Sequence, residues 1–96
     1  MNDTIFITGG AKRIGKAIVA HFHKIGWNVI FQYRTSSESA KLISEELNGI
    51  RSNSCFAYQA DLDSLKDINR LCNDIQKNHN NLNAIINNAS TFYPNQ

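Results

Sequence analysis

The sequence predicts an α/β fold in which a parallel β-sheet is covered by helices on both faces. Short apolar or β-branched runs alternate along the chain with longer segments whose apolar residues recur with helical spacing. The first run ends in a glycine pair, Gly9 and Gly10, directly before a helical segment. With 96 residues, of which 42% are hydrophobic, the chain is long enough for one domain. Short strands joined by helices pair in parallel, because such connections are right-handed crossovers.

Strands are expected where these apolar and β-branched residues cluster. They span Thr4–Thr8, Asn28–Tyr33, Cys55–Ala60 and Leu82–Asn87. The first is a continuous apolar run, which is typical of a buried parallel strand. Because a helix separates each strand from the next, we expect the sheet order 3-2-1-4, the first half of a three-layer, doubly wound sheet of the Rossmann type.

Helices are expected between the strands, each marked by apolar residues on one face. The apolar stripes are Ile14, Ile18, Phe22 and Ile25; Ala40, Ile43 and Leu47; and Leu65, Ile68, Leu71, Cys72 and Ile75. Gly26 and Gly49 are the expected ends of the first two helices. Ser64 is the expected N-cap of the third helix, and residues 35–38 have the spacing of a capping box before the second.

Composition and charge exclude several classes of protein. The formal net charge is +2 at pH 7, without the basic cluster of a nucleic-acid-binding protein. The apolar runs are too short to span a bilayer, and the first residues lack the features of a secretory signal. Cys55 and Cys72 are expected to be thiols in a reducing compartment, the cytoplasm. His21 and His23 do not face each other on their helix, so no metal site is predicted.

The segment T-G-G-A-K-R-I-G at residues 8–15 is the main candidate for a ligand site. It lies between a buried strand and an amphipathic helix, the context in which a glycine turn binds phosphate. Gly9 permits the tight turn, and Gly15 lets the helix pack closely on the strand. Amides and the positive end of the helix dipole then face an anion, and Lys12 and Arg13 add positive charge. The spacing is G-x-x-x-R-x-G, and the alternative is a glycine-rich turn without a ligand.

The residues after the second strand indicate which dinucleotide to expect. Folds that prefer NAD often place an acidic residue about 20 positions after the glycine turn. The corresponding stretch here contains Tyr33, Arg34, Thr35 and Ser36, and no acid. The Arg34 guanidinium suits a phosphate and Ser36 offers a hydroxyl, so we expect NADP(H), held through its ribose 2′-phosphate. The alternative for Arg34 is a solvated surface arginine.

With these residues, the sequence resembles the short-chain dehydrogenase/reductases, specifically their pteridine reductase branch, over the whole chain. The resemblance depends on the glycine turn at residues 8–15, Q-Y-R-T-S at 32–36, Q-A-D-L at 59–62 and N-N-A-S-T-F-Y-P at 87–94. It implies an NADPH-dependent oxidoreductase that reduces a pterin, dihydropterin or dihydrofolate by hydride transfer, with a homo-oligomeric, tetrameric full-length form. Two alternatives stay open: a reductase of another carbonyl or alcohol substrate, and a non-catalytic or unfolded NADP-binding fragment.

The resemblance also implies roles for individual residues around the glycine turn. Gly9, Ile14 and Gly15 would shape the pyrophosphate turn. Arg13 would lie over the cofactor phosphates and near the pterin. Asp61 would accept a hydrogen bond from the adenine amino group, and its alternative role is to cap the following helix.

Further roles fall on residues that follow the third and fourth strands. Leu62 would supply a backbone contact, and Asn88 and Ala89 would run past the adenine-side ribose. Ser90 would contact both cofactor and substrate, and Phe92 would stack on the flat pterin ring. The alternatives are that Asn88 only ties strands together and that Phe92 is a core aromatic of a loop.

The catalytic residues of the resembled family are expected to lie outside this chain. Family enzymes are longer, and their proton donor is a Tyr with a Lys four positions on. At that spacing Tyr33 is followed by Ser37 and Tyr58 by Leu62, and Tyr93 has no such residue. Residues 1–96 are therefore expected to be the N-terminal part of a single NADP-binding domain and to show little turnover alone.

Overall fold

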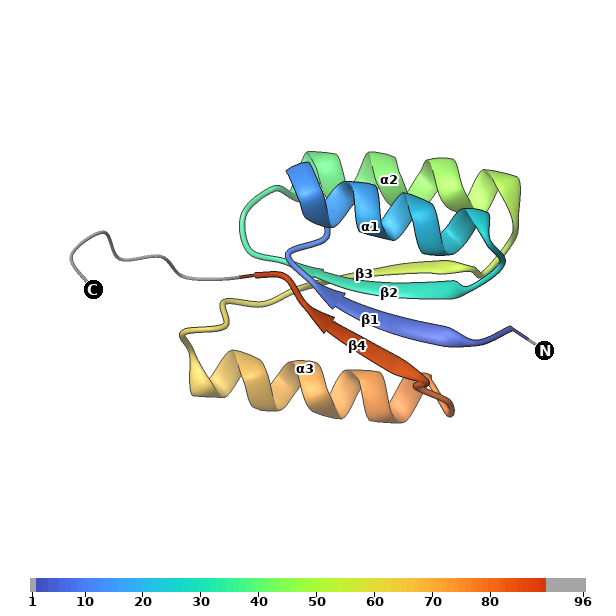
Figure 1. Cartoon of the computed structure of the whole chain (residues 1–96). Coiled ribbons are helices and arrows are strands. Elements are labelled where there is room, and N and C mark those ends of the chain that lie inside the picture. The colour runs from blue at the N-terminus through green and yellow to red at the C-terminus, as the bar shows by residue number, and fades with distance from the viewer. Residues whose placement is uncertain (1, 90–96) are drawn as a thin grey trace.

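Strands and helices alternate along residues 2–89, which the computed structural model describes (Figure 1). The elements are β1 (Thr4–Thr8), α1 (Arg13–Lys24), β2 (Asn28–Tyr33), α2 (Ser37–Ile50), β3 (Cys55–Gln59), α3 (Leu65–Asn78) and β4 (Ala84–Asn87). Every expected strand and helix is present. β3 ends before Ala60 and β4 begins after Asn83, so these two strands are slightly shorter than expected.

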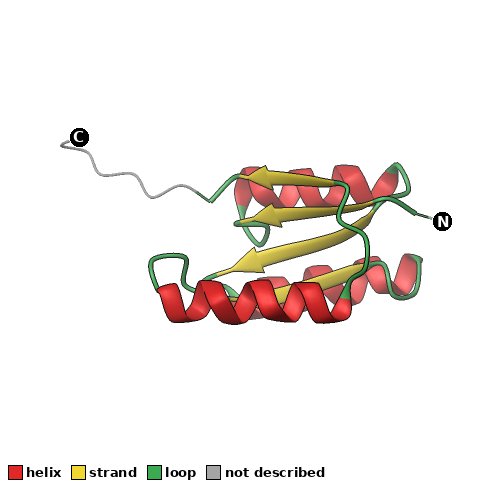
Figure 2. Ribbon diagram, turned by 90° about the horizontal axis from the view of Figure 1, so that it is seen from below, coloured by secondary structure: helices red, strands yellow, loops and turns green. Residues whose placement is uncertain are grey.

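All strand pairs in the sheet are parallel, and the strand order is β3-β2-β1-β4. α1 and α2 cover one face of the sheet and α3 lies on the other, so the sheet is the middle of three layers (Figure 1, Figure 2). The expected α/β class, layering and strand order are confirmed. The order reverses between β1 and β4, and in doubly wound folds ligands bind at the carboxyl ends of the strands near such a reversal.

The main core lies between the sheet and the layer formed by α1 and α2. Alternate residues of the two central strands point to this layer, because successive side chains of a strand face opposite sides. Ile5, Ile7, Val29 and Phe31 are at most 1% exposed and belong to this core. The two helices contribute Val19, Ala40, Ile43 and Leu47. This packing fixes the two helices against the strands whose ends carry the candidate site.

The buried face of α1 differs from the expected apolar stripe. Ile14 and Ile25 are 69% and 55% exposed, whereas Gly15, Val19 and His23 are buried. The expected stripe is therefore wrong at both of its ends. The physical reason is that Gly15 faces the backbone of the preceding turn and that His23 is a buried polar residue with a partner. Neither residue is apolar, so hydrophobic periodicity does not find them.

Three of the expected helix ends are confirmed and one is wrong. α2 ends at Ile50, next to the expected Gly49. The Ser64 hydroxyl accepts a hydrogen bond from the Asp67 N–H at 3.2 Å, as an N-cap does. Gly26 has φ +103° just after α1, and its N–H donates to the His23 carbonyl. Ser36 is the N-cap residue of α2 but makes no side-chain capping hydrogen bond, so the capping box at residues 35–38 does not form.

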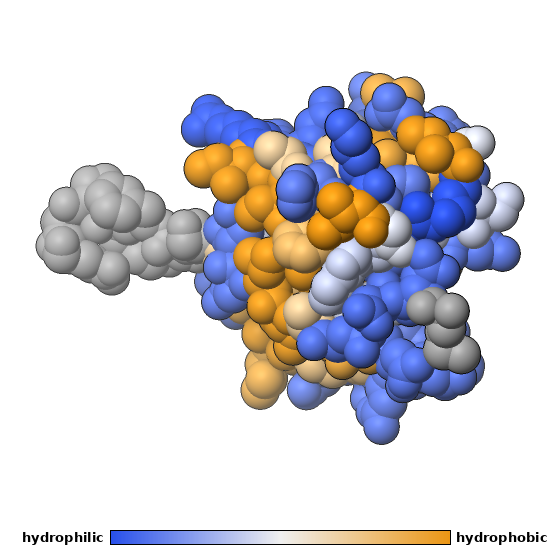
Figure 3. Space-filling view, turned by 45° about the vertical axis from the view of Figure 1, so that its right-hand side comes forward, coloured by the Kyte–Doolittle hydropathy of each residue, from blue (hydrophilic) through white to orange (hydrophobic). Residues whose placement is uncertain are grey.

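The face of the sheet that carries α3 is only partly covered. Leu71 is buried, but Leu65 is 72% exposed and Cys72 is exposed. The expected stripe of α3 is therefore wrong at Leu65 and Cys72, because α3 is the only helix on this face of the described chain and these side chains have little to pack against. Ile85 of β4 is also exposed, and in Figure 2 no described helix lies in front of β4. In Figure 3 apolar residues form a band left of centre, with further apolar residues toward the upper right of the view.

Within residues 2–89, no helix combines the length and the apolar character needed to cross a membrane. The same residues hold no group of three or more His, Cys, Asp or Glu side chains placed for a metal ion. Cys55 is buried and Cys72 exposed, and both are free thiols.

Candidate functional site

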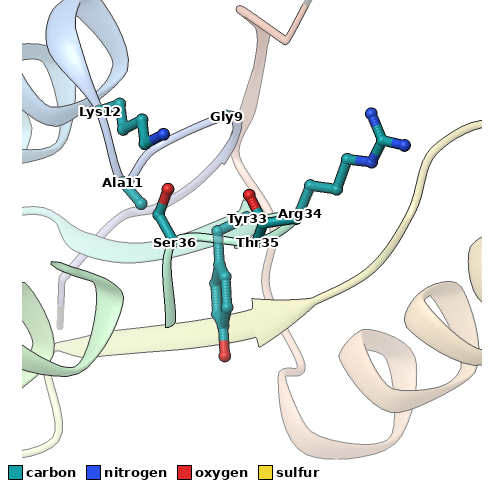
Figure 4. Close-up of a pocket in the computed structure, with 7 residues that line it drawn as sticks. All are labelled: Gly9, Ala11, Lys12, Tyr33, Arg34, Thr35 and Ser36. Atoms are coloured by element: carbon teal, nitrogen blue, oxygen red, sulfur yellow. The ribbon is translucent and has the colours of Figure 1, made fainter. Parts of the chain in front are cut away.

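A cavity of about 160 Å³ opens at the carboxyl ends of β1 and β2 (Figure 4). The residues that line it are Gly9, Ala11, Lys12, Tyr33, Arg34, Thr35 and Ser36. They come from the connection between β1 and α1 and from the connection between β2 and α2. These connections meet because parallel strands end at the same edge of the sheet. All the lining residues except Ala11 belong to the site expected from the sequence.

The turn between β1 and α1 has the backbone geometry that glycine supplies. Gly9 has φ +69°, in the left-handed region that favours glycine. A Cβ on Gly15 would overlap the carbonyl group of Gly9, so α1 and the turn approach more closely than any side chain allows. Arg13, the first residue of α1, also has a positive φ of +50°. For a residue other than glycine this conformation costs about 1 kcal/mol, a strain that is common at ligand-binding turns.

The start of α1 is open to an anion. Lys12 is the N-cap residue and makes no side-chain capping hydrogen bond, and the first turn of α1 contains no acidic residue. Uncapped N–H groups and the positive end of the helix dipole attract negative charge. The side chains of Lys12 and Arg13 are exposed and add positive charge at the same place. The turn therefore has the chemistry of a phosphate site.

The side chains around the cavity differ in direction (Figure 4). Lys12 and Ser36 reach toward the same space, the ring of Tyr33 points away from it, and Arg34 extends to the side. Arg34 Nε lies 3.9 Å from Asp61 Oδ1, so the end of β2 and the segment after β3 are neighbours. An exposed ion pair of this kind contributes at most about 1 kcal/mol, which leaves the guanidinium available to an anionic ligand.

Asp61 is held in place by the segment between β3 and α3. Its carboxylate accepts a hydrogen bond from the Asp63 N–H at 2.9 Å, and its own N–H donates to Asp67 Oδ2 at 2.8 Å. This backbone hydrogen bond, with the charge of Arg70, holds the pKa of Asp67 below its usual range. Ser64 is the N-cap of α3, so the capping alternative for Asp61 is wrong.

The residues after β4 contact the glycine turn. Asn88 Nδ2 donates to the Gly9 carbonyl at 3.2 Å, and the Ala89 N–H donates to Thr8 Oγ1 at 2.9 Å. The Thr8 hydroxyl in turn donates to Asn87 Oδ1 at 2.9 Å. Asn88 therefore ties the ends of β4 and β1 together, which is the structural alternative considered for it. Both Asn88 and Ala89 lie at the edge of the sheet that carries the cavity.

The remaining expected residues are distributed along the same edge or fall outside the described chain. Ile14 is exposed at the start of α1, and Leu62 is half-buried after β3. Ser90 and Phe92, the expected substrate contacts, lie outside the described residues. Sequence patterns assign no role to Gln32, yet its buried side chain accepts a hydrogen bond from the Gly9 N–H at 2.9 Å. The sequence feature that could have drawn attention to Gln32 is its place as a polar residue near the end of a mostly apolar strand.

A doubly wound sheet whose first turn offers uncapped amides and cations to an anion defines the class of dinucleotide-binding α/β domains. Residues 3–96 match the short chain dehydrogenase family. The chain belongs to this family of oxidoreductases, which confirms the resemblance seen in its motifs. The match includes every described helix and strand.

Similar curated proteins carry several different names. Pteridine reductase 1 of Leishmania tarentolae is 29% identical over 105 aligned residues, which cover 92% of this chain and 36% of that protein. Dihydromonapterin reductase of Enterobacter sp. (strain 638) is 35% identical over 88 residues, 92% of this chain and 34% of the relative. A 3-oxoacyl-(acyl-carrier-protein) reductase of Staphylococcus epidermidis is 26% identical over 91 residues, 93% of this chain and 36% of the relative. The chain thus spans about a third of the length of these curated relatives.

Proposed function

We propose that this chain binds NADP(H) and belongs to an NADPH-dependent reductase of a pterin, dihydropterin or dihydrofolate. The observation that carries the cofactor assignment is the position of Arg34. This residue directly follows β2, lines the cavity at the glycine turn and has no acidic neighbour in residues 32–36. Its nearest acidic partner, Asp61, lies 3.9 Å away on a different segment.

Electrostatics favour a 2′-phosphate over a free 2′-hydroxyl at this position. A phosphate monoester carries about 1.5–2 negative charges at neutral pH. Arg34 and Lys12 both line the cavity, and Arg13 adds a further cation at the start of α1. An acidic residue in place of Arg34 would repel the phosphate and instead bind the hydroxyl of NAD.

In the proposed binding mode, the parts of the cofactor lie one after another along the carboxyl edge of the sheet. The pyrophosphate lies against the uncapped amides at the start of α1, where Gly9, Ile14 and Gly15 shape the turn. Arg34 and Ser36 hold the 2′-phosphate, with Tyr33 and Thr35 beside them in the cavity wall. The adenosine lies along Asp61, Leu62, Asn88 and Ala89. When bound, the cofactor supplies the hydride, and this chain's residues bind and orient it.

Two of the named relatives support a pterin-like substrate. One is a pteridine reductase and one a dihydromonapterin reductase, each covering 92% of this chain. Arg13 is exposed at the start of α1, where it reaches both cofactor phosphates and substrate in the proposed complex, and Ser90 and Phe92 complete the substrate contacts. The relative named as a 3-oxoacyl reductase favours a second candidate, a carbonyl or alcohol substrate at the same cofactor site. A non-catalytic NADP-binding role is the third.

The proposal extends to the whole protein. Because the chain spans about a third of its relatives, we propose that residues 1–96 form the N-terminal part of a single NADP-binding domain. The Tyr–Lys pair then comes from residues outside this chain. The resemblance to the pteridine reductases supports a homotetramer, and the two free thiols suit a reducing cytoplasm.

A direct comparison of ligands tests the proposal. The whole protein should bind NADPH at least about tenfold more tightly than NADH, a difference of about 1.4 kcal/mol in binding free energy. Oxidation of NADPH should then be faster with a dihydropterin than with a 3-oxoacyl thioester. Equal affinity for the two cofactors would remove the NADP assignment, and faster turnover of the thioester would favour the second candidate. Tight NADPH binding without any turnover would favour the non-catalytic role.

A further inference from the structure

Gln32 is a buried polar residue in the strand beneath the candidate site. It is 2% exposed and follows the buried apolar residues Val29, Ile30 and Phe31 of β2. A buried amide is unfavourable unless hydrogen bonds replace its contacts with water. The partners of Gln32 therefore decide what its side chain does.

Those partners are backbone groups of the segments that follow the two neighbouring strands, β1 and β3. Gln32 Oε1 accepts a hydrogen bond from the Gly9 N–H at 2.9 Å, and Gln32 Nε2 donates to the Ala60 carbonyl at 2.7 Å. The orientation of the amide follows from chemistry, because an N–H requires an acceptor and a carbonyl a donor. One side chain thus links the end of β1 to the residue that precedes Asp61.

The main chain of Gln32 adds a second bond to the same turn. Its carbonyl accepts a hydrogen bond from the Gly10 N–H at 3.0 Å. Both glycine amides therefore point into the sheet and not toward a ligand. The amides left for an anion are those at the start of α1, after Lys12. The side chain of Gln32 thus occupies the Gly9 amide, and its main-chain carbonyl occupies the Gly10 amide.

The position of α1 depends on the same contact. Gly9 has φ +69°, and its carbonyl group lies against Gly15 of α1 so closely that a Cβ there would overlap it. The side chain of Asn88 donates to that carbonyl at 3.2 Å. Gly9 is thus held by Gln32 through its N–H, and by Gly15 and Asn88 around its carbonyl. A shift of Gly9 would move the start of α1.

We propose that Gln32 is the positioning residue of the cofactor site. By holding the Gly9 N–H it fixes the amides at the start of α1 at the place where the pyrophosphate binds. The Ala60 carbonyl is the anchor on the other side. The inference rests on the proposed NADP(H) function, and Gln32 itself does not touch the cofactor.

The first test separates positioning from general stability. In the whole protein, Gln32→Met keeps the size of the side chain and removes both of its hydrogen bonds. We expect the dissociation constant of NADP⁺ to rise about tenfold or more, and that of adenosine 2′-monophosphate, which lacks the pyrophosphate, to change less than about twofold. Gln76→Met, the same change at an exposed position of α3, is the control and should alter neither. Unchanged NADP⁺ affinity, or equal losses for both ligands, would overturn the proposal.

The second test uses a proton in place of an amide hydrogen. In Gln32→Glu, a protonated carboxyl accepts from the Gly9 N–H and donates to the Ala60 carbonyl, whereas a carboxylate repels that carbonyl and the cofactor phosphates. NADP⁺ affinity relative to wild type should therefore recover as the pH is lowered from about 8 to about 5, because burial raises a carboxyl pKa. For Gln32→Met, the NADP⁺ affinity relative to wild type should not depend on pH. If the NADP⁺ affinity of Gln32→Glu relative to wild type does not change with pH, the proposal is contradicted.

A measurement on the wild type keeps the inference testable if both variants fail to fold. The Gly9 N–H should exchange with solvent at least about a hundredfold more slowly than in an unstructured peptide, because it is bonded inside the sheet. If the Gly9 N–H exchanges as fast as in an unstructured peptide, the role of Gln32 is overturned, and the proposed NADP(H) function is unaffected. Absence of NADP⁺ binding by the wild type would overturn the proposed function, and with it the role of Gln32, before any variant is compared.

Discussion

His23 Nε2 of α1 lies 2.7 Å from Ser54 Oγ, just before β3, and both side chains are buried. The Ser54 hydroxyl donates its proton to the Arg51 carbonyl, so its oxygen accepts the hydrogen bond from His23. His23 Nε2 is therefore the donor in this pair. This contact links the end of α1 to the connection between α2 and β3. Burial, with the charge of Arg51, lowers the pKa of His23.

The lowered pKa predicts that acid destabilises the fold. The folded-state pKa of His23 lies below the ordinary value of 6.5, so the unfolded chain takes up its proton first as the pH falls. The contribution of His23 to the free energy of unfolding is fully present above about pH 6.5 and is lost as the pH falls below that value. Burial lowers the pKa of His79 as well, which acts in the same direction. The free energy of unfolding in urea should be nearly constant from about pH 8 to 7 and fall from about pH 6.5 to 5.

Histidine variants assign this pH dependence to a residue. His23→Gln should cost about 1–2 kcal/mol at neutral pH and flatten part of the fall below pH 6.5, with the part due to His79 left in place. His21→Gln changes an exposed histidine on the same helix and should keep the full pH dependence. A protein that becomes more stable between pH 6.5 and 5 would contradict this prediction.

Replacing Arg34 should change cofactor preference. Arg34→Ala removes the guanidinium that follows β2, so NADPH should bind about 10–100-fold more weakly, while NADH affinity should change less than about twofold. Lys41→Ala removes one positive charge from an exposed position of α2 and controls for net charge. Calorimetric titration of each variant with both cofactors provides the measurement. Equal losses for NADPH and NADH would show that Arg34 does not read the 2′-phosphate.

Replacing Gly15 should damage both the fold and the site. The methyl group in Gly15→Ala would overlap the Gly9 carbonyl, so α1 must move away from the turn. Overpacking of a tight contact typically costs about 1–3 kcal/mol, and NADPH binding should be lost along with the stability. Gly49→Ala is a matched control in α2, because nothing lies within 4 Å of its new Cβ. That variant should be more stable by about 0.5–1 kcal/mol. Wild-type stability and binding in Gly15→Ala would contradict the close contact.

Several residues that the sequence singled out from local patterns lie together in the structure. The glycine turn and the residues after β2 line one cavity, because parallel strands bring their carboxyl ends to one edge. The expected buried face is confirmed for α2, where Ala40, Ile43 and Leu47 are buried, but it is partly wrong for α1 and α3. Ile14 and Leu65 continue apolar stripes but are exposed, since a helix buries whatever residues meet its neighbour. Sequence patterns also assigned no role to Gln32, whose importance depends on where Gly9 and Ala60 lie.

The sequence by itself determined the alternation of strands and helices, the parallel order of the sheet and the place of the glycine turn. Each of these depends on patterns within a few residues or on the connection between neighbouring elements. Only the tertiary structure decided the bonds of Gln32 to Gly9 and of His23 to Ser54, which join residues 23 and 31 positions apart. A polar side chain carries no local sign of its partner, because burial and the geometry of hydrogen bonds exist only once distant segments have packed.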